Sequence, residues 1–245
     1  MVKLTFVSAC HRLVVGLPKI GIRMLLKLVS YKLCPYAQRV LITLRHKKVP
    51  YDIEFVDIAQ PPAWLKELSP LGEVPIMVVD NKEVLFESSV ICEFIDDTTP
   101  GGRLLPEDPL LRALDRSWMA YAGSALRGVS GVMHARTQTQ WDESLDVLKN
   151  KMCWLQNELQ QTPYFNGQAL TLVDFAYAPL FMRMRLLQLD RELGLTEHYP
   201  KVAAWAKVLL ALPLVQGSVV SNFDELFRAN VVTHGPFTAQ RLGWR

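Results

Sequence analysis

Two short apolar segments flank an amphipathic one near the start of this chain. Leu25–Ser30 and Tyr51–Val56 are predicted strands, and residues 35–48 between them form a predicted helix whose apolar side chains recur every three or four positions. A strand, a helix and a second strand within about thirty residues make a βαβ unit, and the two strands of such a unit are parallel. The first part of the chain therefore contains a parallel pair of strands.

The next segments are predicted to complete a sheet. After a short helical stretch at Trp64–Leu68, the apolar runs Ile76–Val79 and Glu83–Phe86 are joined by Asp80-Asn81-Lys82, which is typical of a hairpin. Ser88–Asp97 then has the apolar spacing of a helix. A β-α-β unit followed by a β-β-α unit predicts one mixed, four-stranded sheet.

The pattern changes after residue 98. Residues 99–108 are rich in proline and glycine and are predicted to be a linker between a first domain, residues 24–98, and an all-helical domain, residues 109–230. Residues 231–245 are expected to form a tail. The predicted helices of the second domain are marked by Leu111–Trp118, by the apolar stripe from Trp141 to Leu159, by the capping box Thr171–Asp174, by Ala203–Leu210 and by Leu214–Phe227.

Residues 1–23 stand apart because they contain four cations and no acid. We expect this segment, which includes Cys10, to be a disordered or non-native extension ahead of Met24. An organelle transit peptide and a poor signal peptide are the alternatives, although His11 and Arg12 interrupt any apolar core of a secretion signal.

Composition and charge narrow the class of protein. The net charge is only +3, so no basic face large enough to follow a nucleic acid backbone is expected. The chain has four cysteines without C-x-x-C or zinc spacing, which favours a reducing, cytoplasmic location and no metal site. No segment reaches the roughly 20 apolar residues of a membrane span, so none is expected.

Cys34 is the strongest candidate for a catalytic residue. It follows a predicted strand and precedes a predicted helix, and Pro35 suits the first helical position. Cys34 should therefore be the N-cap, where backbone amides and the helix dipole lower a thiol pKa and favour the nucleophilic thiolate. Cys92 and Cys153 fall on apolar helical stripes and are expected in the core.

Two further motifs are candidates for ligand binding. Gly72-Glu73-Val74-Pro75 enters a strand, and a cis Val74–Pro75 bond would turn the Val74 backbone groups toward a peptide ligand, although a trans bond is the alternative. Glu87-Ser88-Ser89 lies between a strand and a helix, where Ser88 is an expected N-cap. That helix start could bind a ligand carboxylate beside Glu87, or Ser88 could simply cap the helix.

Taken together, these motifs resemble the glutathione transferase superfamily from about Met24 to Arg228. Cys34–Arg39 is similar to the cysteine motif of the omega class, and Phe86–Phe94 and Leu104–Pro109 are also omega-like. The resemblance implies a thioredoxin-like first domain followed by an all-helical second domain. It also implies a homodimer, with glutathione as co-substrate and a small electrophilic or disulfide compound as second substrate.

The resemblance also implies roles for single residues. Cys34 would form a mixed disulfide with glutathione, Pro75 would be the family's cis-proline, and Val74 would pair with the cysteinyl backbone of glutathione. Glu87 and Ser88 would hold the γ-glutamyl end of glutathione, and Tyr36 would lie beside the Cys34 thiol. Arg183 would lie in the co-substrate pocket.

One position departs from the omega pattern. Where omega enzymes usually carry a lysine that binds the glycyl carboxylate of glutathione, this chain has Pro61. Weaker glutathione binding, or another cation in its place, is therefore expected.

Three functions remain open from the sequence. The first is a thioltransferase or reductase that acts through Cys34 on glutathionylated or dehydroascorbate-like acceptors. The second is conjugation of glutathione to electrophiles, as in detoxification, with Tyr31 as the fallback group that would stabilise the glutathione thiolate. The third is a non-enzymatic glutathione-binding regulatory protein.

Overall fold

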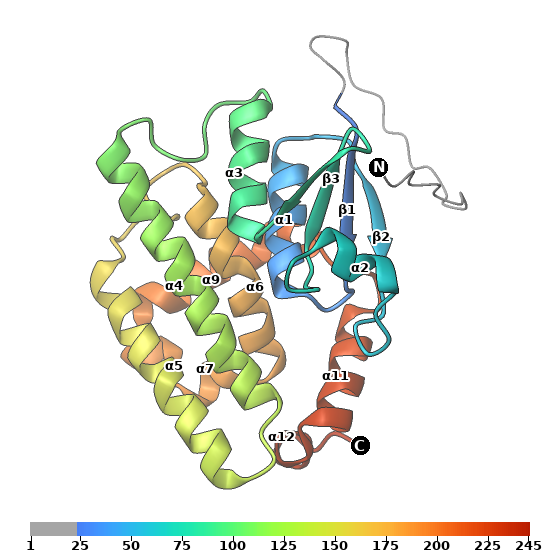
Figure 1. Cartoon of the computed structure of the whole chain (residues 1–245). Helices are drawn as coiled ribbons and strands as arrows, with labels where there is room; N and C mark the ends of the chain where they lie inside the picture. The colour runs from blue at the N-terminus through green and yellow to red at the C-terminus, as the bar shows by residue number, and fades with distance from the viewer. Residues whose placement is uncertain (1–23) are drawn as a thin grey trace.

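A computed structural model describes residues 24–245 of the chain (Figure 1). The predictions for residues 1–23, including the interpretation of Cys10, lie outside this described part.

The first domain contains the predicted four-stranded mixed sheet, with strand order β2-β1-β3-β4. Strand β1 pairs in parallel with β2 and antiparallel with β3, and β3 pairs antiparallel with β4. The strands are β1 Leu26–Ser30, β2 Asp52–Phe55, β3 Ile76–Val79 and β4 Glu83–Phe86.

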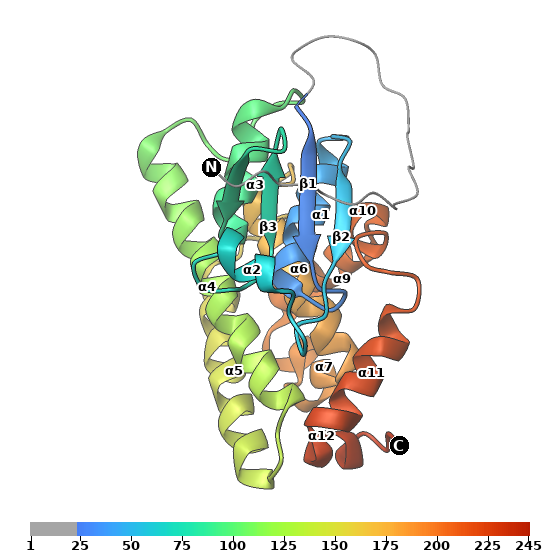
Figure 2. The same cartoon turned by 45° about the vertical axis from the view of Figure 1, so that its right-hand side comes forward.

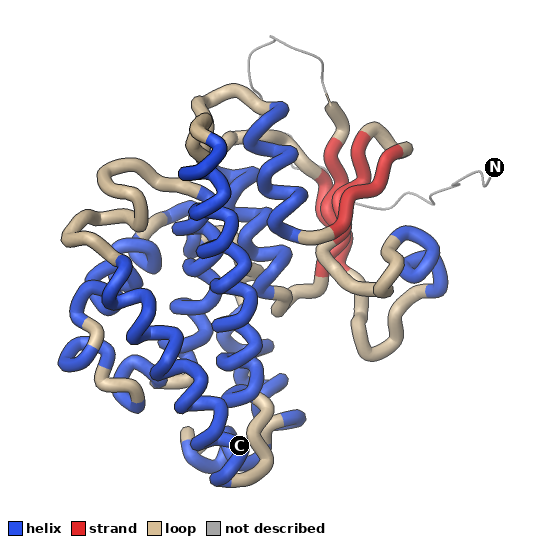
Figure 3. The backbone as a smooth tube through the Cα atoms, turned by 60° about the vertical axis from the view of Figure 1, so that its left-hand side comes forward, coloured by secondary structure: helices blue, strands red, loops and turns tan. Residues whose placement is uncertain are grey.

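Three helices cover the two faces of this sheet. Helices α1, Pro35–His46, and α3, Ser88–Thr98, lie on the face toward the second domain, whereas α2, Ala63–Leu68, lies on the opposite face (Figure 3). Every residue of β3 is buried, because it packs under helices on both sides. The predicted thioredoxin-like arrangement is confirmed.

The second domain is all-helical, as predicted. Helix α6 runs through its centre and buries side chains around most of its circumference, and it packs against α1 of the first domain (Figure 2). The helices are α4 Pro109–Met133, α5 Gln138–Glu158, α6 Leu172–Leu186, α7 Leu189–Glu192, α8 Leu195–His198, α9 Pro200–Ala211, α10 Pro213–Gln216, α11 Phe223–His234 and α12 Pro236–Arg241.

The capping box at the start of α6 is present as predicted. The Asp174 carboxylate accepts hydrogen bonds from the Thr171 amide at 2.8 Å and from the Trp205 indole at 2.8 Å. Asp174 is fully buried, so this carboxylate ties the start of α6 to α9 in the interior of the domain.

Three expectations about the helical domain were wrong. Leu214–Phe227 is not one helix, because residues 217–222 form a loop between α10 and α11. Residues 231–245 do not form a tail, since they contain the end of α11 and all of α12, which bury Val231 and Thr238. Cys153 is exposed rather than in the core, because it lies beside the apolar stripe of α5 and not on it.

A buried ion pair of the first domain anchors the linker that leads from α3 to α4. Lys47 Nζ lies 2.7 Å from the Asp96 carboxylate, and both side chains are almost completely buried. Lys47 also donates to the Gly102 carbonyl at 2.5 Å, and Asp96 accepts from the Leu104 amide at 2.9 Å. The connection between the domains is therefore held by both members of the pair.

Among the helices of residues 24–245, none combines the length and apolar composition that crossing a bilayer requires.

Candidate functional site

Cys34 is the N-cap of α1, as predicted from the sequence. A tight turn after β1 places it there, with the Cys34 amide donating to the Tyr31 carbonyl at 2.9 Å. The Cys34 sulfur accepts from the Ala37 amide at 3.4 Å, which satisfies one of the free amides of the helix start. The thiol in turn donates to the Val74 carbonyl at 3.6 Å.

The predicted lowering of the thiol pKa was wrong in direction. Burial raises the pKa of Cys34 above its ordinary value, because loss of hydration disfavours the thiolate more than its surroundings stabilise it. The opposing influences that lower this pKa are the amides of Ala37 and Tyr36, followed by the charges of Arg183 and Arg39. In the free protein Cys34 is therefore a protonated thiol, although the groups around it would stabilise a thiolate.

The Val74–Pro75 peptide bond is cis, as the resemblance implied. The strand register explains why this segment lies beside the other predicted site residues. Val29 of β1 and Phe86 of β4 both pair with Ile76 of β3. Pro75, which precedes Ile76, therefore lies at the same end of the sheet as the residues that follow β1 and β4.

Glu87 and Ser88 lie at that end of the sheet, but their local structure differs from the prediction. Ser88 is the first residue of α3 and is buried, whereas Glu87 occupies the N-cap position and makes no side-chain capping bond. Ser88 does not act as a cap because it is itself the first helical residue, which leaves the N-cap position to Glu87. Glu87 has a φ of 66°, which is uncommon for a residue with a side chain and is often found at functional sites.

Arg183, which the resemblance assigns to the co-substrate pocket, lies beside the turn that carries Cys34. It is buried on α6, and its guanidinium donates to the Gln38 side chain at 2.6 Å, to the Pro179 carbonyl at 2.9 Å and to the Leu33 carbonyl at 2.7 Å. Burial lowers the pKa of Arg183 to about 10, although the nearby Cys34 and Tyr31 raise it. Arg183 thus fixes the turn that carries Cys34.

Gln38 was not singled out as a site residue. It lies one helical turn after Cys34, accepts from Arg183, and donates to the Ser218 hydroxyl at 3.1 Å. No clear signal in the sequence marks it, because α1 also buries the polar side chains of Arg39 and Thr43. Gln38 connects the start of α1 with the loop at residues 217–222.

Arg39 and Tyr36 form a second contact between the domains. The Tyr36 hydroxyl donates to the Gly123 carbonyl of α4 at 3.4 Å, and the Arg39 guanidinium lies 5.3 Å from the centre of the Tyr36 ring. Arg39 is buried with Nε and Nη2 lacking a hydrogen-bond partner. Its charge favours the Cys34 thiolate.

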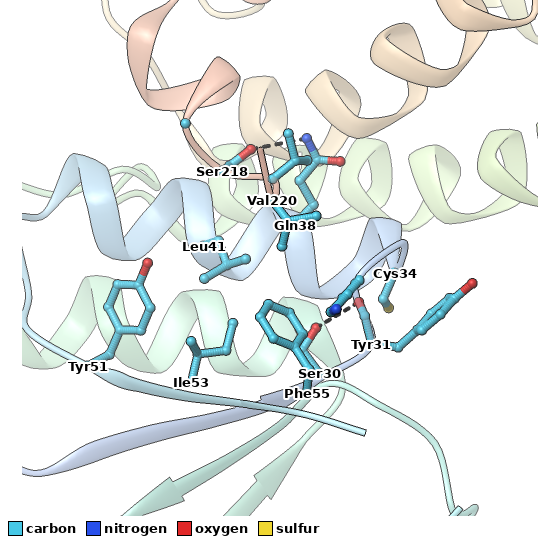
Figure 4. Close-up of a pocket in the computed structure, with 13 residues that line it drawn as sticks. Ser30, Tyr31, Cys34, Gln38, Leu41, Tyr51, Ile53, Phe55, Ser218 and Val220 are labelled. Carbon is cyan, nitrogen blue, oxygen red and sulfur yellow. Dashed lines mark hydrogen bonds between the residues drawn. The ribbon is translucent and has the colours of Figure 1, made fainter. Parts of the chain in front are cut away.

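Two cavities adjoin the turn that carries Cys34. One, of about 140 Å³, lies between α1, β2 and the loop at residues 217–222, and Cys34 lines it (Figure 4). The other, of about 510 Å³, lies between Tyr31–Leu33 and one face of α11. Val74, Glu87 and Arg183 line neither of them.

No group of three or more potential ligand side chains in residues 24–245 is placed to hold a metal ion.

Comparison with known proteins identifies the family. Residues 33–98 match the family model for the N-terminal domain of glutathione S-transferases, and residues 137–207 match the model for their C-terminal domain. Together these matches cover more than half of the chain, which therefore belongs to the glutathione S-transferase family. The resemblance predicted from the sequence is confirmed.

Several relatives are of the omega class. The chain is 28% identical over 204 residues to glutathione S-transferase omega-1 of Sus scrofa, which covers 82% of this chain and 83% of that protein. It is 28% identical over 201 residues to pyrimidodiazepine synthase of Drosophila melanogaster, covering 78% and 79% of the two chains.

Solved structures show the same fold. The crystal structure of glutathione transferase Omega 3C from Trametes versicolor has a TM-score of 0.69 and 28% identity, covering 79% of this chain and 88% of that one. Rice GST1, solved in complex with glutathione, has a TM-score of 0.74 and 21% identity, covering 89% and 99%.

Proposed function

We propose that this transferase is a glutathione-dependent thioltransferase or reductase whose catalytic residue is Cys34. The observation that carries the proposal is the position of the Cys34 sulfur, at the N-cap of α1 and 3.6 Å from the carbonyl that precedes the cis proline. Similarity to omega-class proteins supports it.

The proposed reaction exchanges one disulfide for another. The Cys34 thiolate attacks the glutathionyl sulfur of a mixed disulfide, a new bond forms between these two sulfurs, and the acceptor leaves as a thiolate that takes up a proton. The thiolate of a second glutathione then attacks the glutathionyl sulfur on Cys34. This step releases oxidised glutathione and restores the Cys34 thiolate, so two electrons pass from glutathione to the acceptor.

The surroundings of Cys34 suit this chemistry once the thiol loses its proton. The amide of Ala37 and the charges of Arg183 and Arg39 all favour the thiolate. In the free protein the Val74 carbonyl accepts a hydrogen bond from the Cys34 thiol. In the proposal the cysteinyl amide of glutathione takes over that carbonyl, which removes a contact that stabilises only the protonated form.

The opposite end of glutathione would be held at the start of α3. The exposed Glu87 carboxylate is available for the γ-glutamyl ammonium, and the amides at the first turn of α3 suit its carboxylate. On the glycyl side, Lys66 of α2 is exposed and packs over Gly72, two residues before Val74. Lys66 is therefore our candidate for the cation that Pro61 does not supply.

Intact-mass spectrometry after incubation with oxidised glutathione tests the function directly. One glutathionyl adduct should form on the wild-type protein and be absent from Cys34→Ser, together with all thioltransferase activity. Cys153→Ser, which changes an exposed cysteine on α5, is the matched control and should behave as wild type. An adduct mapped to Cys92 or Cys153 with Cys34 free would contradict the proposal.

The same variant separates the alternative functions. Burial raises the pKa of Tyr31, so its hydroxyl stays protonated and could donate a hydrogen bond to a glutathione thiolate. Conjugation of electrophiles that survives in Cys34→Ser would favour this second activity. Glutathione binding without turnover of either kind would instead indicate a regulatory binding protein.

A homodimer is part of the proposal. Five exposed apolar side chains support it, on the β4–α3 segment and the start of α4: Phe86, Val90, Leu110, Leu111 and Leu114. The ion pair between Glu93 and Arg116 joins α3 to α4 next to these side chains. Sedimentation should give a dimer at micromolar concentration and a monomer for Val90→Glu. A monomeric wild-type protein would refute this assembly.

A further inference from the structure

Arg39 and Arg183 are both buried, but only Arg183 has hydrogen-bond partners for its guanidinium. Arg183 donates to one side chain and to two backbone carbonyls. Arg39 of α1 is only 4% exposed, and its Nε and Nη2 atoms meet no acceptor within residues 24–245. Buried donors are nearly always paired in folded proteins, because a donor that gives up water without gaining an acceptor destabilises the fold.

A third buried polar atom in the same part of the interior has no partner. It is the hydroxyl of Tyr177, a fully buried residue of α6, and α6 packs against α1. The Arg39 charge acts on this hydroxyl and lowers its pKa, against a larger effect of burial in the opposite direction. In residues 24–245 these three atoms are the buried side-chain nitrogens and oxygens without a partner, and they come together at one place.

Packing keeps both side chains where they are. The Tyr177 ring lies with its centre 4.9 Å from that of Trp205 and 6.1 Å from that of Phe181. Because a phenol oxygen lies on the axis of its ring, the Tyr177 hydroxyl cannot turn toward another partner. The Arg39 guanidinium lies 5.3 Å from the centre of the Tyr36 ring, which holds it from the other side.

The charge of Arg39 is not balanced by the side chains around it. The groups that act electrostatically on its pKa are thiols and phenols, and no carboxylate of residues 24–245 is among them: Cys92, Tyr36, Cys34 and Tyr177. Thiols and phenols are protonated at neutral pH, and burial raises the pKa of Cys92 further, to about 11. A water molecule could accept the three hydrogen bonds, but only an anion would also balance the buried cation.

We propose that the Arg39 guanidinium and the Tyr177 hydroxyl bind a small inorganic anion, of the size of chloride, in the interior between α1 and α6. All three groups can donate to such an ion, since a guanidinium has no acceptor and a protonated phenol keeps its O–H. The site uses none of the residues assigned to glutathione, so it does not depend on the proposed function.

Thermal melting of the full-length protein in sodium chloride and in sodium gluconate tests the site, with equal ionic strength so that screening is the same. Gluconate is too large for a position between two packed helices. Chloride should raise the melting temperature of wild type saturably, by about 3–5 °C at ten times its dissociation constant. Arg39→Met, which keeps the apolar stem but removes the donors, should lose this increase.

Two further variants make the result specific. Tyr177→Phe removes one oxygen and keeps the ring packing, so it should remain folded and bind chloride about tenfold more weakly. Arg185→Met removes an exposed arginine of α6 and should respond to chloride as wild type does. No response of wild type would mean that only water meets these donors, and equal responses of wild type and Arg39→Met would place the ion elsewhere. Either result would overturn the inference.

Crystals soaked in sodium bromide locate the ion directly. An anomalous bromide peak should lie within hydrogen-bond distance of both Arg39 and Tyr177, and it should be absent from Arg39→Met crystals. Water alone at this position, or bromide only at surface positions as an adventitious ion only, would contradict the proposal.

A bound anion also has a consequence for Cys34, the N-cap of the helix that carries Arg39. The Arg39 charge favours the Cys34 thiolate, and an anion beside Arg39 offsets that charge. Alkylation of Cys34 by iodoacetamide should therefore be slower in chloride than in gluconate, by about twofold or more, and Arg39→Met should show no difference between the two salts. Equal rates for wild type would refute this consequence, while melting and the bromide peak decide the site itself.

Discussion

Replacing Arg183 by methionine should destabilise the fold and raise the thiol pKa of Cys34 further. Methionine keeps the apolar stem of the side chain but removes the guanidinium that bonds Gln38, Pro179 and Leu33. Leu33 immediately precedes Cys34, so the loss falls on the turn that positions the thiol. The charge that favours the thiolate is lost as well.

The size of the effect follows from two opposing contributions. Each hydrogen bond from a charged group contributes about 1.5–3 kcal/mol, and three are lost. The opposing contribution is the cost of burying the charge. Burial lowers the pKa of Arg183 to about 10, a shift that corresponds to roughly 3 kcal/mol of lost hydration of the cation. The uncharged methionine does not carry this cost. The hydrogen bonds outweigh this cost, since acceptors are left buried without a partner, and we expect a net loss of about 2–4 kcal/mol.

Urea unfolding and the pH dependence of Cys34 alkylation measure these two effects. Arg185→Met is the matched control, because Arg185 is on the same helix but exposed, and it should change the free energy of unfolding by less than about 0.5 kcal/mol. If Arg183→Met were as stable as Arg185→Met and showed the same alkylation profile as wild type, the positioning role would be refuted.

Two further predictions concern the free protein and its ligand. Only the thiolate reacts with iodoacetamide, and the pKa of Cys34 is raised. The alkylation rate of the glutathione-free protein should therefore rise about tenfold per pH unit from pH 7 through roughly 8.5. A plateau of this rate near neutral pH would show that the pKa is low instead. Lys66→Met should weaken glutathione binding about tenfold without affecting an analogue that lacks the glycyl carboxylate, and Lys82→Met is the exposed control. If Lys66→Met has no such selective effect but Pro61→Lys tightens glutathione binding, the carboxylate site lacks a cation in the natural chain.

The parts of the fold that could be predicted depend on local rules. The alternation of strands and helices in residues 24–98 follows from apolar spacing, and Cys34 was placed at an N-cap because proline follows it. The capping box at Thr171–Asp174 is equally local. The split between α10 and α11 was missed because Gly217 and Ser218 are a weak interruption within an otherwise helical pattern.

The electrostatics of the site could not be predicted in the same way. The N-cap rule gave the correct position for Cys34 but the wrong direction for its pKa, because burial depends on packing between domains. Arg183 and Ser218 reach this region from far along the chain, and no spacing in the sequence relates them to Gln38. The cavity of about 140 Å³ beside Cys34 depends on the same long-range contacts.

The Lys47–Asp96 pair makes the connection between the domains a fixed joint rather than a hinge. The pair is bonded to Gly102 and Leu104 of the linker, and the Leu104 carbonyl in turn accepts from the Leu172 amide of α6 at 3.3 Å. Rotating the helical domain away from the sheet would break some of these bonds, and each bond to a charged group contributes about 1.5–3 kcal/mol. Closure of whole domains around a substrate is therefore disfavoured, and access to Cys34 should depend on smaller displacements, such as those of the loop at residues 217–222. The same joint should make both domains melt in a single cooperative transition.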